Sequence, residues 1–309
     1  MNETREFLRS LGLPDGDAHH LPTSSKRFPD GAQYRVEIPS VEGPAAMRAV
    51  IAACEEFGVQ IHRVSQGSGI MLLTDDEIRE MAELGVTQRW EVSLFVGPRA
   101  GWEVSATALT PAGKNIGARH RGMDQLVYAM EDIRRAMQLG MRGVLVADEG
   151  LLWLTGEAKK RGFLPPELVV KVSVQMGAAN PASIRLMQGW GAGTYNPPTD
   201  LSLAQLAAIR QAVDIPLDVY VEVPDDFGGF VRHYEIPELV RVAAPVHLKF
   251  GLRNAPGIYP SGKHLEAAAV AQSRERVRRA RLGLDMLRRY YPEAITSQPG
   301  AAGLALPKV

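Results

Sequence analysis

Charged and polar side chains alternate with aliphatic ones along five short segments, at residues 33–38, 90–96, 170–175, 217–223 and 246–250. A period of two places the polar residues on one face of a strand. If helices cover the aliphatic faces, the polar faces point into one shared interior, where unpaired charges are costly. A substrate, a metal ion or mutual ion pairing would offset that cost. The polar set consists of Arg35, Glu37, Glu91, Ser93, Lys171, Ser173, Gln175, Asp218, Tyr220, Glu222, His247 and Lys249.

Three glutamates in this set, Glu37, Glu91 and Glu222, belong to separate strands. Carboxylates that converge repel one another unless a cation or protons neutralise them, and oxygen-rich sites suit Mg²⁺ or Mn²⁺. We therefore predict a divalent metal site formed by these glutamates together with His62, in which the glutamates also serve as acid or base. Ion pairing of each glutamate with an interior cation is the alternative.

Lys249 lies near the end of its segment and is a catalytic candidate. A desolvated lysine forms Schiff bases, whereas a charged one stabilises an enolate or a carboxylate. Residues 251–254 follow it, and exposed N–H groups beside an arginine suit a small anion. We predict that the substrate is held by Arg63, Gln175, Tyr195, Tyr220, Arg253 and Asn254.

Strand-like runs occur eight times, and a segment with helical spacing follows each. The runs cover residues 33–38, 59–64, 90–96, 143–147, 169–175, 192–195, 217–223 and 245–250. Two capping patterns, at residues 74–77 and 202–205, mark helix starts. Eight such units with a polar inner face predict a (β/α)8 TIM-type barrel, whose active site lies at the carboxyl ends of the strands.

The barrel is expected to span residues 31–292. Residues 1–30 are interpreted as an N-terminal arm or a lid, and residues 293–309, rich in Ala, Gly and Pro, as a disordered tail. The connection 97–122 is long for its position, and long loops are usually functional or disordered. The last helix, at about 264–290, carries seven arginines, which we interpret as a solvated face or a subunit contact; the second interpretation predicts a homo-oligomer through this helix.

Composition excludes several classes of function. Lys plus Arg and Asp plus Glu both number 35, so no net charge favours nucleic acid or an anionic membrane. The single cysteine, Cys54, excludes an internal disulfide and a self-contained iron–sulfur cluster. No glycine-rich nucleotide motif occurs, which argues against a nucleotide cofactor. No run of about 20 apolar residues and no signal peptide is present, so we expect a cytoplasmic protein.

The chain resembles the peptidase U32 family at residues 169–181, 192–209 and 218–222. The shared features are a strand ending in Ser-x-Gln, an Asn that opens the next helix, a Leu-Ser-Leu helix start and a strand ending in Glu. The resemblance implies a barrel and a peptidase or collagenase activity. Several branches of the family place cysteines for an iron–sulfur cluster after this last strand, but here residues 221–230 contain none. We therefore expect a branch without the cluster.

These observations favour lyase or isomerase chemistry on a small anionic metabolite, with the glutamates as metal ligands or acid/base groups and with Lys249 and Arg253 holding the negative charge. The alternatives are hydrolysis of peptides or amides, as the family resemblance implies, and a non-catalytic barrel that binds a small molecule.

Overall fold

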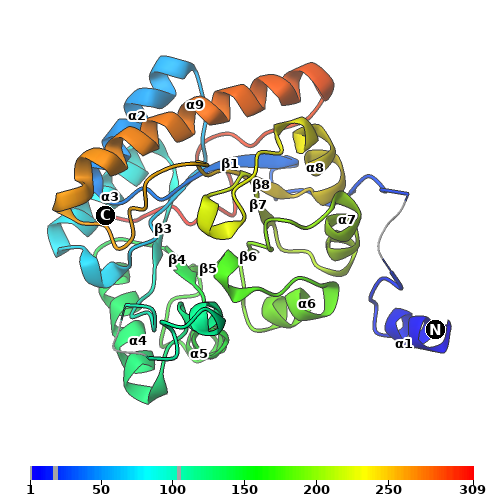
Figure 1. Ribbon diagram of the computed structural model, residues 1–309, viewed down its shortest axis with the longest axis horizontal. Helices are drawn as coiled ribbons and strands as arrows, with labels where there is room; N and C mark the ends of the chain where they lie inside the picture. The colour runs from blue at the N-terminus through cyan, green and yellow to red at the C-terminus, as the bar shows by residue number, and fades with distance from the viewer. Residues whose placement is uncertain (1, 17–19, 103–105) are drawn as a thin grey trace.

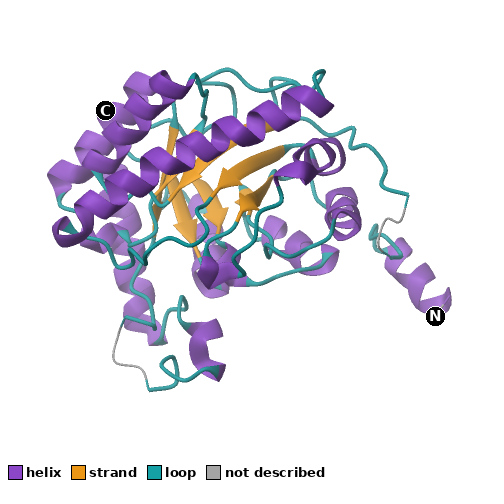
Figure 2. Cartoon of the chain, turned by 45° about the horizontal axis from the view of Figure 1, so that its top comes forward, coloured by secondary structure: helices purple, strands orange, loops and turns teal. Residues whose placement is uncertain are grey.

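Eight parallel strands close into a barrel in which each strand pairs with its neighbours in chain order, from β1 to β8 and back to β1 (Figure 1). The computed structural model describes residues 2–16, 20–102 and 106–309. Figure 2 shows the strands inside a shell of helices. The predicted (β/α)8 TIM-type barrel is confirmed.

The elements alternate as expected. The strands are β1 (Tyr34–Pro39), β2 (Arg63–Ser65), β3 (Glu91–Phe95), β4 (Gly143–Val146), β5 (Val169–Val172), β6 (Thr194–Tyr195), β7 (Leu217–Glu222) and β8 (Val246–Phe250). The helices are α1 (Asn2–Ser10), α2 (Pro44–Phe57), α3 (Asp75–Gln88), α4 (Gly122–Gln138), α5 (Glu149–Lys160), α6 (Pro181–Gly189), α7 (Leu203–Ala212), α8 (Ile236–Ala243) and α9 (Glu266–Tyr290). The second strand begins later than predicted, and residues 174–176 form a 3₁₀ turn rather than the end of a strand.

The period-two pattern separates an apolar outer face of the barrel from a polar interior. Val36, Val64 and Val92 face outward and are buried in the main hydrophobic core. The parallel register places Arg63 between Glu37 and Glu91, so these three side chains share the interior at neighbouring strands. Charged residues therefore fill a space that aliphatic residues fill in many barrels.

Two helix starts follow the predicted capping chemistry. The Thr74 side chain accepts from the backbone N–H of Glu77, and the Glu77 carboxylate accepts from the backbone N–H of Thr74. Ser202 and Gln205 make the same pair of bonds at the start of α7. These bonds satisfy N–H groups that would otherwise lack partners in the first turn.

The C-terminal segment closes the amino-terminal mouth of the barrel. Ser297 Oγ accepts from Arg35 Nε at 2.8 Å, and the Ser297 carbonyl lies 2.8 Å from His62 Nε2. The backbone N–H of Ala305 donates to Glu91 Oε2 at 3.1 Å. This placement differs from the predicted disordered tail, because the partners of these residues are interior polar groups far away in the sequence.

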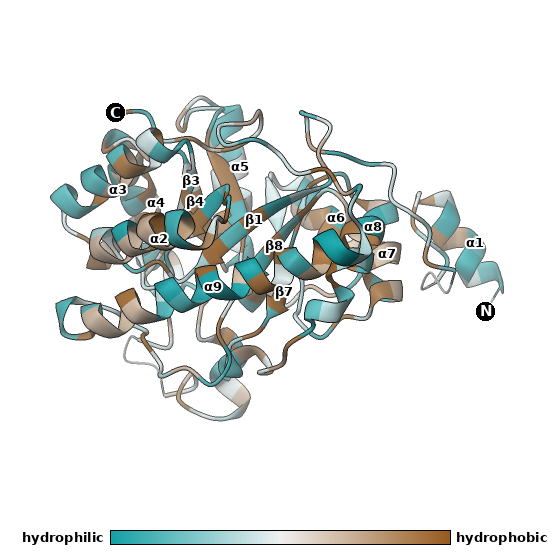
Figure 3. Ribbon diagram, turned by 90° about the horizontal axis from the view of Figure 1, so that it is seen from above, coloured by the Kyte–Doolittle hydropathy of each residue, from teal (hydrophilic) through white to brown (hydrophobic). Residues whose placement is uncertain are grey.

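Part of the N-terminal arm lies at the same mouth. Phe28 is buried, and the Arg35 guanidinium lies 4.0 Å from its ring centroid. Ser24 Oγ donates to the Ala244 carbonyl at 2.5 Å. Residues 20–33 therefore cover the base of the barrel, opposite the mouth where an active site is expected, whereas α1 stands off the body (Figure 3). Residues 17–19 of the arm lie outside the described residues.

Helix α9 crosses the outside of the barrel beside α2 (Figure 1). Several of its arginines pair with carboxylates of the same helix, as Arg278 does with Glu275 and Arg281 with Asp285. A homo-oligomer through this helix stays a prediction. Among the described residues, no helix is long and apolar enough to cross a membrane.

Removing residues 296–309 should destabilise the fold, because Arg35, His62 and Glu91 would each lose a buried hydrogen-bond partner. At about 1–3 kcal/mol for each unsatisfied buried group, the free energy of unfolding should fall by roughly 3 kcal/mol or more. Urea denaturation followed by circular dichroism measures this change, with Gln298→Ala, an exposed position in the same segment, as the control. An unchanged denaturation midpoint in the truncated protein would show that the segment does not support the barrel.

Candidate functional site at the carboxyl ends of the strands

A cavity of about 1090 Å³ opens at the carboxyl ends of the strands. We call it the mouth cavity. Its lining is more polar than that of an ordinary ligand pocket and mixes both signs of charge. The polar and charged members are Ser40, Ser65, Gln66, Arg99, Lys114, Asn115, Arg119, Ser173, Gln175, Asn196, Tyr220, Asp225, Asp226, Lys249 and Tyr259.

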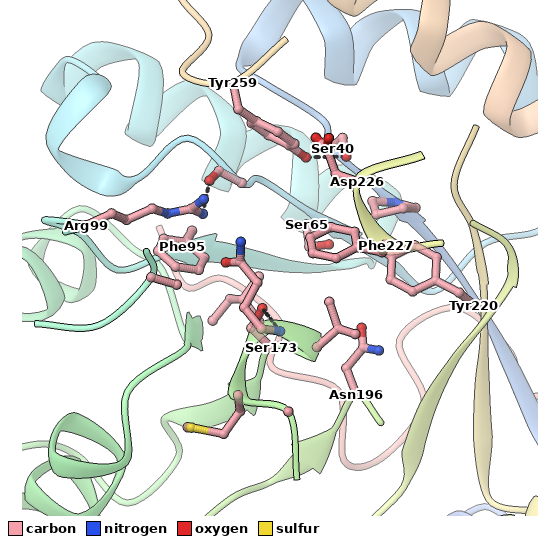
Figure 4. Close-up of a pocket in the computed structure, with 18 of the residues that line it drawn as sticks. Ser40, Ser65, Phe95, Arg99, Ser173, Asn196, Tyr220, Asp226, Phe227 and Tyr259 are labelled. Carbon is pink, nitrogen blue, oxygen red and sulfur yellow. Dashed lines mark hydrogen bonds between the residues drawn. The ribbon is translucent and has the colours of Figure 1, made fainter. Parts of the chain in front are cut away.

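Lys249 lies at the floor of the mouth cavity and is only 3% exposed. Its ammonium donates to Asn196 Oδ1, lies 4.2 Å from the centroid of the Tyr220 ring and is 3.6 Å from Glu37 Oε1. Asn196 and Tyr220 belong to the same wall of the cavity (Figure 4). The amine is therefore held in one position, where it would contact the innermost end of a small ligand in the cavity.

Five charged residues lie beneath Lys249, and together with it they form a group of six that we call the lumen network: Arg63, Lys171, Lys249, Glu37, Glu91 and Asp218. The Arg63 guanidinium reaches all three carboxylates, with Nε 2.6 Å from Glu91 Oε1, Nη1 2.9 Å from Asp218 Oδ1 and Nη1 3.3 Å from Glu37 Oε2. Lys171 donates to Glu37 and lies 3.6 Å from Asp218. Three positive and three negative groups are thus paired in the barrel interior, and Lys249 is the member that also reaches the mouth cavity.

The pKa shifts in the lumen network agree with this pairing. Burial by itself would raise the pKa of Glu37, but the charges of Lys171, Lys249 and Arg63 together lower it to about 2. Burial by itself would also raise the pKa of Asp218, but the charges of Lys171 and Arg63 hold it well below its usual range. Burial, reinforced by Arg63, lowers the pKa of His247 to about 3, so this ring is neutral at pH 7. Glu37 and Asp218 are therefore permanent counter-ions rather than proton carriers near neutral pH.

The long connection between β3 and α4 supplies one wall of the mouth cavity. The Arg99 guanidinium stacks between two aromatic rings, 3.5 Å from the Phe95 centroid and 4.5 Å from the Trp102 centroid, and donates to the Gly67 carbonyl (Figure 4). Burial lowers the pKa of Arg99 to about 10, which leaves it charged. Arg119 fixes the end of the connection by donating to Glu149 Oε1 at 2.9 Å.

The turn after β7 supplies the facing wall. It contains Asp225 and Asp226, both of which line the cavity. The Asp225 carboxylate accepts from the backbone N–H of Asn254 and lies 3.8 Å from Arg253 Nε. Asp225 is therefore committed to the loop after β8, and Asp226 is the carboxylate of this turn that faces the cavity without such a role.

Ser40 sits at the end of β1 with a left-handed backbone, at φ 61°. This conformation is uncommon for a residue other than glycine, and such residues gather at functional sites. The Tyr259 hydroxyl donates to Ser40 Oγ, and both residues line the cavity (Figure 4). Burial raises the pKa of Tyr259 above its ordinary value, so the phenol stays protonated.

The structure brings together only part of the predicted site. Lys249, Gln175 and Tyr220 line the mouth cavity. Glu37 and Arg63 lie directly beneath it in the lumen network. The Tyr195 hydroxyl donates to the Ala178 carbonyl at 2.9 Å, and Tyr195 does not line the cavity.

The predicted metal site of Glu37, Glu91, Glu222 and His62 is not assembled. Within the described residues, no three His, Cys, Asp or Glu side chains are grouped so as to hold a metal ion. Glu91 begins β3 and binds Arg63 and Ala305, and His62 binds the C-terminal segment, so both lie at the amino-terminal base. Binding of Mg²⁺ or Mn²⁺ by another arrangement stays a prediction.

Glu222 lies apart from the other glutamates because a register irregularity follows Tyr220 in β7. Its Oε1 accepts from the backbone N–H of Arg253 at 3.1 Å, and its Oε2 is 3.7 Å from Arg279 Nε. Burial raises its pKa. The N–H groups of Arg253 and Asn254, predicted to hold a substrate anion, are thus bound to carboxylates of the chain itself.

Sequence reasoning did not select Ser40, Arg99 or Tyr259 as site residues. The unusual length of the connection 97–122 pointed to the segment that holds Arg99. Ser40 and Tyr259 gave no such indication, because only the folded chain brings the end of β1 beside the loop after β8.

The fold and the mouth cavity define a TIM-type barrel with a polar site at the carboxyl ends of its strands. Residues 118–222, about a third of the chain, match the model of Peptidase family U32, which confirms over this segment the resemblance seen in the sequence. No curated protein matches the chain.

Solved structures share the fold at low sequence identity. A protein from Coccidioides immitis, named provisionally as a fructose-1,6-biphosphate aldolase, is 15% identical over 92% of this chain and 94% of that chain, with a TM-score of 0.51. A U32 peptidase is also 15% identical, over 67% of this chain and 74% of that chain, with a TM-score of 0.39. The likeness to the Coccidioides immitis protein shows a common barrel and no common chemistry.

Replacing Glu37 by glutamine should change both the stability and its pH dependence. The lowered pKa of Glu37 means that the carboxylate stabilises the fold above its ordinary pKa of 4.5 and loses this effect as the pH falls to about 2. At pH 7, Glu37→Gln should lower the free energy of unfolding by about 3–5 kcal/mol, since it leaves excess buried positive charge.

Chemical denaturation at pH 7, 4.5 and 3 tests this effect. The variant should lose less stability than the wild type between pH 4.5 and 3, whereas the exposed control Glu83→Gln should follow the wild type. Parallel curves for Glu37→Gln and the wild type would mean that Glu37 is not ionised in the fold.

Proposed function

We propose that this barrel is an enzyme that carries out lyase or isomerase chemistry on a small anionic metabolite, with Lys249 as its central catalytic residue. The position of the Lys249 ammonium at the floor of the mouth cavity carries this proposal. A buried, fixed cation stabilises negative charge that develops on a substrate oxygen far better than a solvated one does. Such charge develops when a proton or a carbon group leaves the position beside a carbonyl.

The neighbours of Lys249 support this role. Asn196 fixes the amine, and the Tyr220 ring covers one side of it. Glu37 is a positioning residue, because it touches Lys249 and Lys171 and does not line the cavity. The lumen network is neutral as a whole, and Glu37 offsets part of the field of Lys249, so the contribution of Lys249 to catalysis would come from its fixed position beside the substrate rather than from an unpaired charge.

Arg99 and Lys114 support the choice of an anionic substrate. Both line the cavity on the connection after β3. The aromatic rings of Phe95 and Trp102 hold the Arg99 guanidinium flat, and a guanidinium so fixed loses little entropy when it binds a carboxylate. The substrate's permanent charge would rest on this wall, while Lys249 meets the charge formed in the reaction.

Hydrolysis of peptides or amides is the second candidate. The family match favours it, since residues 118–222 contribute Ser173, Gln175 and Asn196 to the cavity. Incubation with a peptide library separates the two functions, because a hydrolase would release new amino termini and a lyase or isomerase would not.

Lys249→Met should abolish turnover in a screen of 2-oxo, 2-hydroxy and sugar acids followed by mass spectrometry. The loss should reach at least about a hundredfold, the effect of removing one preorganised donor from a transition state. Lys249→Arg should keep part of the activity if the charge alone is needed, and none if Lys249 forms a Schiff base, which borohydride would trap as a stable adduct.

The control for this screen is Lys263→Met, at an exposed lysine that pairs with Glu266 outside the cavity. Full activity in Lys249→Met, with the substrate still converted, would remove Lys249 from the mechanism.

A further inference from the structure

The charges left unpaired around the mouth cavity stand on opposite sides of it. The wall after β3 carries Arg99, which is 8% exposed and whose Nε has no hydrogen-bond partner in the part of the chain that the structure describes. Lys114 on the same connection forms no ion pair with any described residue. A buried guanidinium nitrogen without a partner indicates a missing acceptor.

Asp226 supplies the opposite charge. It lines the cavity from the turn after β7, and over residues 2–16, 20–102 and 106–309 it forms no ion pair. Strands β3 and β7 are four places apart in a closed ring of eight, so the loops that follow them face each other across the mouth. Figure 4 shows Arg99 and Asp226 entering the cavity from opposite sides.

We propose that the ligand of the mouth cavity is a zwitterion of the amino-acid type, with its carboxylate on Arg99 and Lys114 and its ammonium group on Asp226. The inference rests on the proposed function, which requires only the anionic end. A ligand with both charges would pair the free groups on both walls, whereas a simple anion would leave Asp226 unpaired and slightly repulsive. Lys249 is already paired within the neutral lumen network, so it adds no further unpaired charge for the ligand to neutralise.

Binding of α,ω-amino carboxylates tests the proposal. The probes contain two to six methylene groups, and each is compared with the carboxylate that lacks the amine and with the amine that lacks the carboxylate. Isothermal titration calorimetry should show, for one chain length, binding of the zwitterion about fivefold or more tighter than of either analogue, the effect of one partly buried ion pair.

Asp226→Asn should abolish the advantage of the zwitterion over the carboxylate and should not weaken carboxylate binding, which it should tighten slightly by removing a repulsive charge. Asp200→Asn, at an exposed aspartate outside the cavity lining, is the matched control. If carboxylates bind but the amine adds nothing, the zwitterion is excluded and the proposed function stands. If no carboxylate binds in any form, the anionic substrate itself is excluded, and the proposed function fails with it.

A second, independent observation concerns helix α1, which has no buried residue. Nine residues span about 14 Å, and a helix this short is barely stable alone in water. Phe7 and Leu8 lie about 100° apart around its axis, and Leu11, in the turn directly after the helix, continues the same path because its backbone N–H donates to the Phe7 carbonyl at 3.3 Å, so the three form an apolar face. Phe7 is 60% exposed. The helix therefore lacks the partner that its apolar face requires.

A groove of matching character lies between α4 and α5, with a volume of about 650 Å³. We call it the α4–α5 groove. Met123, Val127, Trp153 and Phe163 line it and are largely exposed, with Met123 at 70%. Glu131 stands on its α4 side and Arg161 on its α5 side. An exposed apolar surface of this kind marks an interaction site.

We infer that α1 of a second copy of this chain fills the α4–α5 groove, in a reciprocal dimer. Around the helix axis, Arg5 flanks one side of the apolar face and Glu3 the other. Arg5 would meet Glu131 on one rim and Glu3 would meet Arg161 on the other, in each case as a second partner beside the existing pairs Glu131–Arg134 and Arg161–Glu157. Its own groove is not the partner of α1, because Arg185 of α6 donates to the Leu11 carbonyl at 2.6 Å and holds the helix away from α4 (Figure 1).

Sedimentation equilibrium of the full chain tests this dimer. Phe7→Asp combined with Leu11→Asp, and separately Trp153→Glu, should each weaken the dimer about a hundredfold or more, since each change places a charge in an apolar contact. Mixing the two variants should restore a dimer, because the helix of the Trp153→Glu chain can still dock in the groove of the other chain. Tyr234→Asp, at an exposed site on neither surface, is the control.

A dimer that survives both variants would overturn the inference and point to another interface, such as α9. A wild-type monomer would overturn it as well. In that case, a change of Trp153 fluorescence on Phe7→Asp would show that α1 docks in the groove of its own chain.

Discussion

The binding of three carboxylates by the Arg63 guanidinium is the interaction on which the rest of the structure depends. Glu37, Glu91 and Asp218 come from β1, β3 and β7, so one side chain on β2 joins strands from around the whole ring. Unpaired, these groups would be very costly to bury, and pairing makes the polar interior compatible with a closed barrel. Lys171 and Lys249 complete the balance, and Lys249 is the member that reaches the mouth cavity. The catalytic candidate is thus fixed in position by neighbours that are themselves paired in the layers beneath it.

Such an interior must be closed to water at one end, which explains why residues 20–33 and the C-terminal segment both lie at the amino-terminal mouth. Phe28 covers Arg35 from one side, and the segment around Ser297 supplies hydrogen bonds to Arg35 and His62. Burial of these groups keeps the effective dielectric low, and it strengthens the ion pairs above them. No residue that the structure describes covers the opposite mouth in this way, and its cavity is open to a ligand. The two ends of one polar channel therefore differ in role: one is a structural seal, and the other is the candidate site.

The sequence predicted the barrel and its polar interior because both follow from a period that each strand carries by itself. It did not predict the height of each side chain in the barrel. Glu91 and Glu37 both occupy inward-facing positions in the alternating pattern of their strands. Glu91 is nevertheless the first residue of its strand, and it binds the backbone N–H of Ala305 at the base of the barrel. Glu222 has the position in the alternating pattern that is expected of an inward-facing residue, but a register irregularity next to it moves its side chain away from the lumen network. Height depends on register and on partners more than a hundred residues away, and no local pattern records either. Arg99 is similar, since its position follows from rings that the folded loop places around it.

The family match and the candidate chemistry come from different parts of the ring. Residues 118–222 include β4 to β7 and supply Ser173, Asn196 and Tyr220 to the cavity. Arg99 and Lys249 lie outside that segment, on β3's connection and on β8. The matched segment contributes Arg119 and several uncharged polar side chains to the cavity, whereas the charges to which the proposed function assigns ligand binding and stabilisation of developing negative charge come from outside that segment. Because the family match covers only one wall of the cavity, it is compatible with more than one reaction. The choice among these reactions rests on Lys249 and on the charges around the mouth of the barrel.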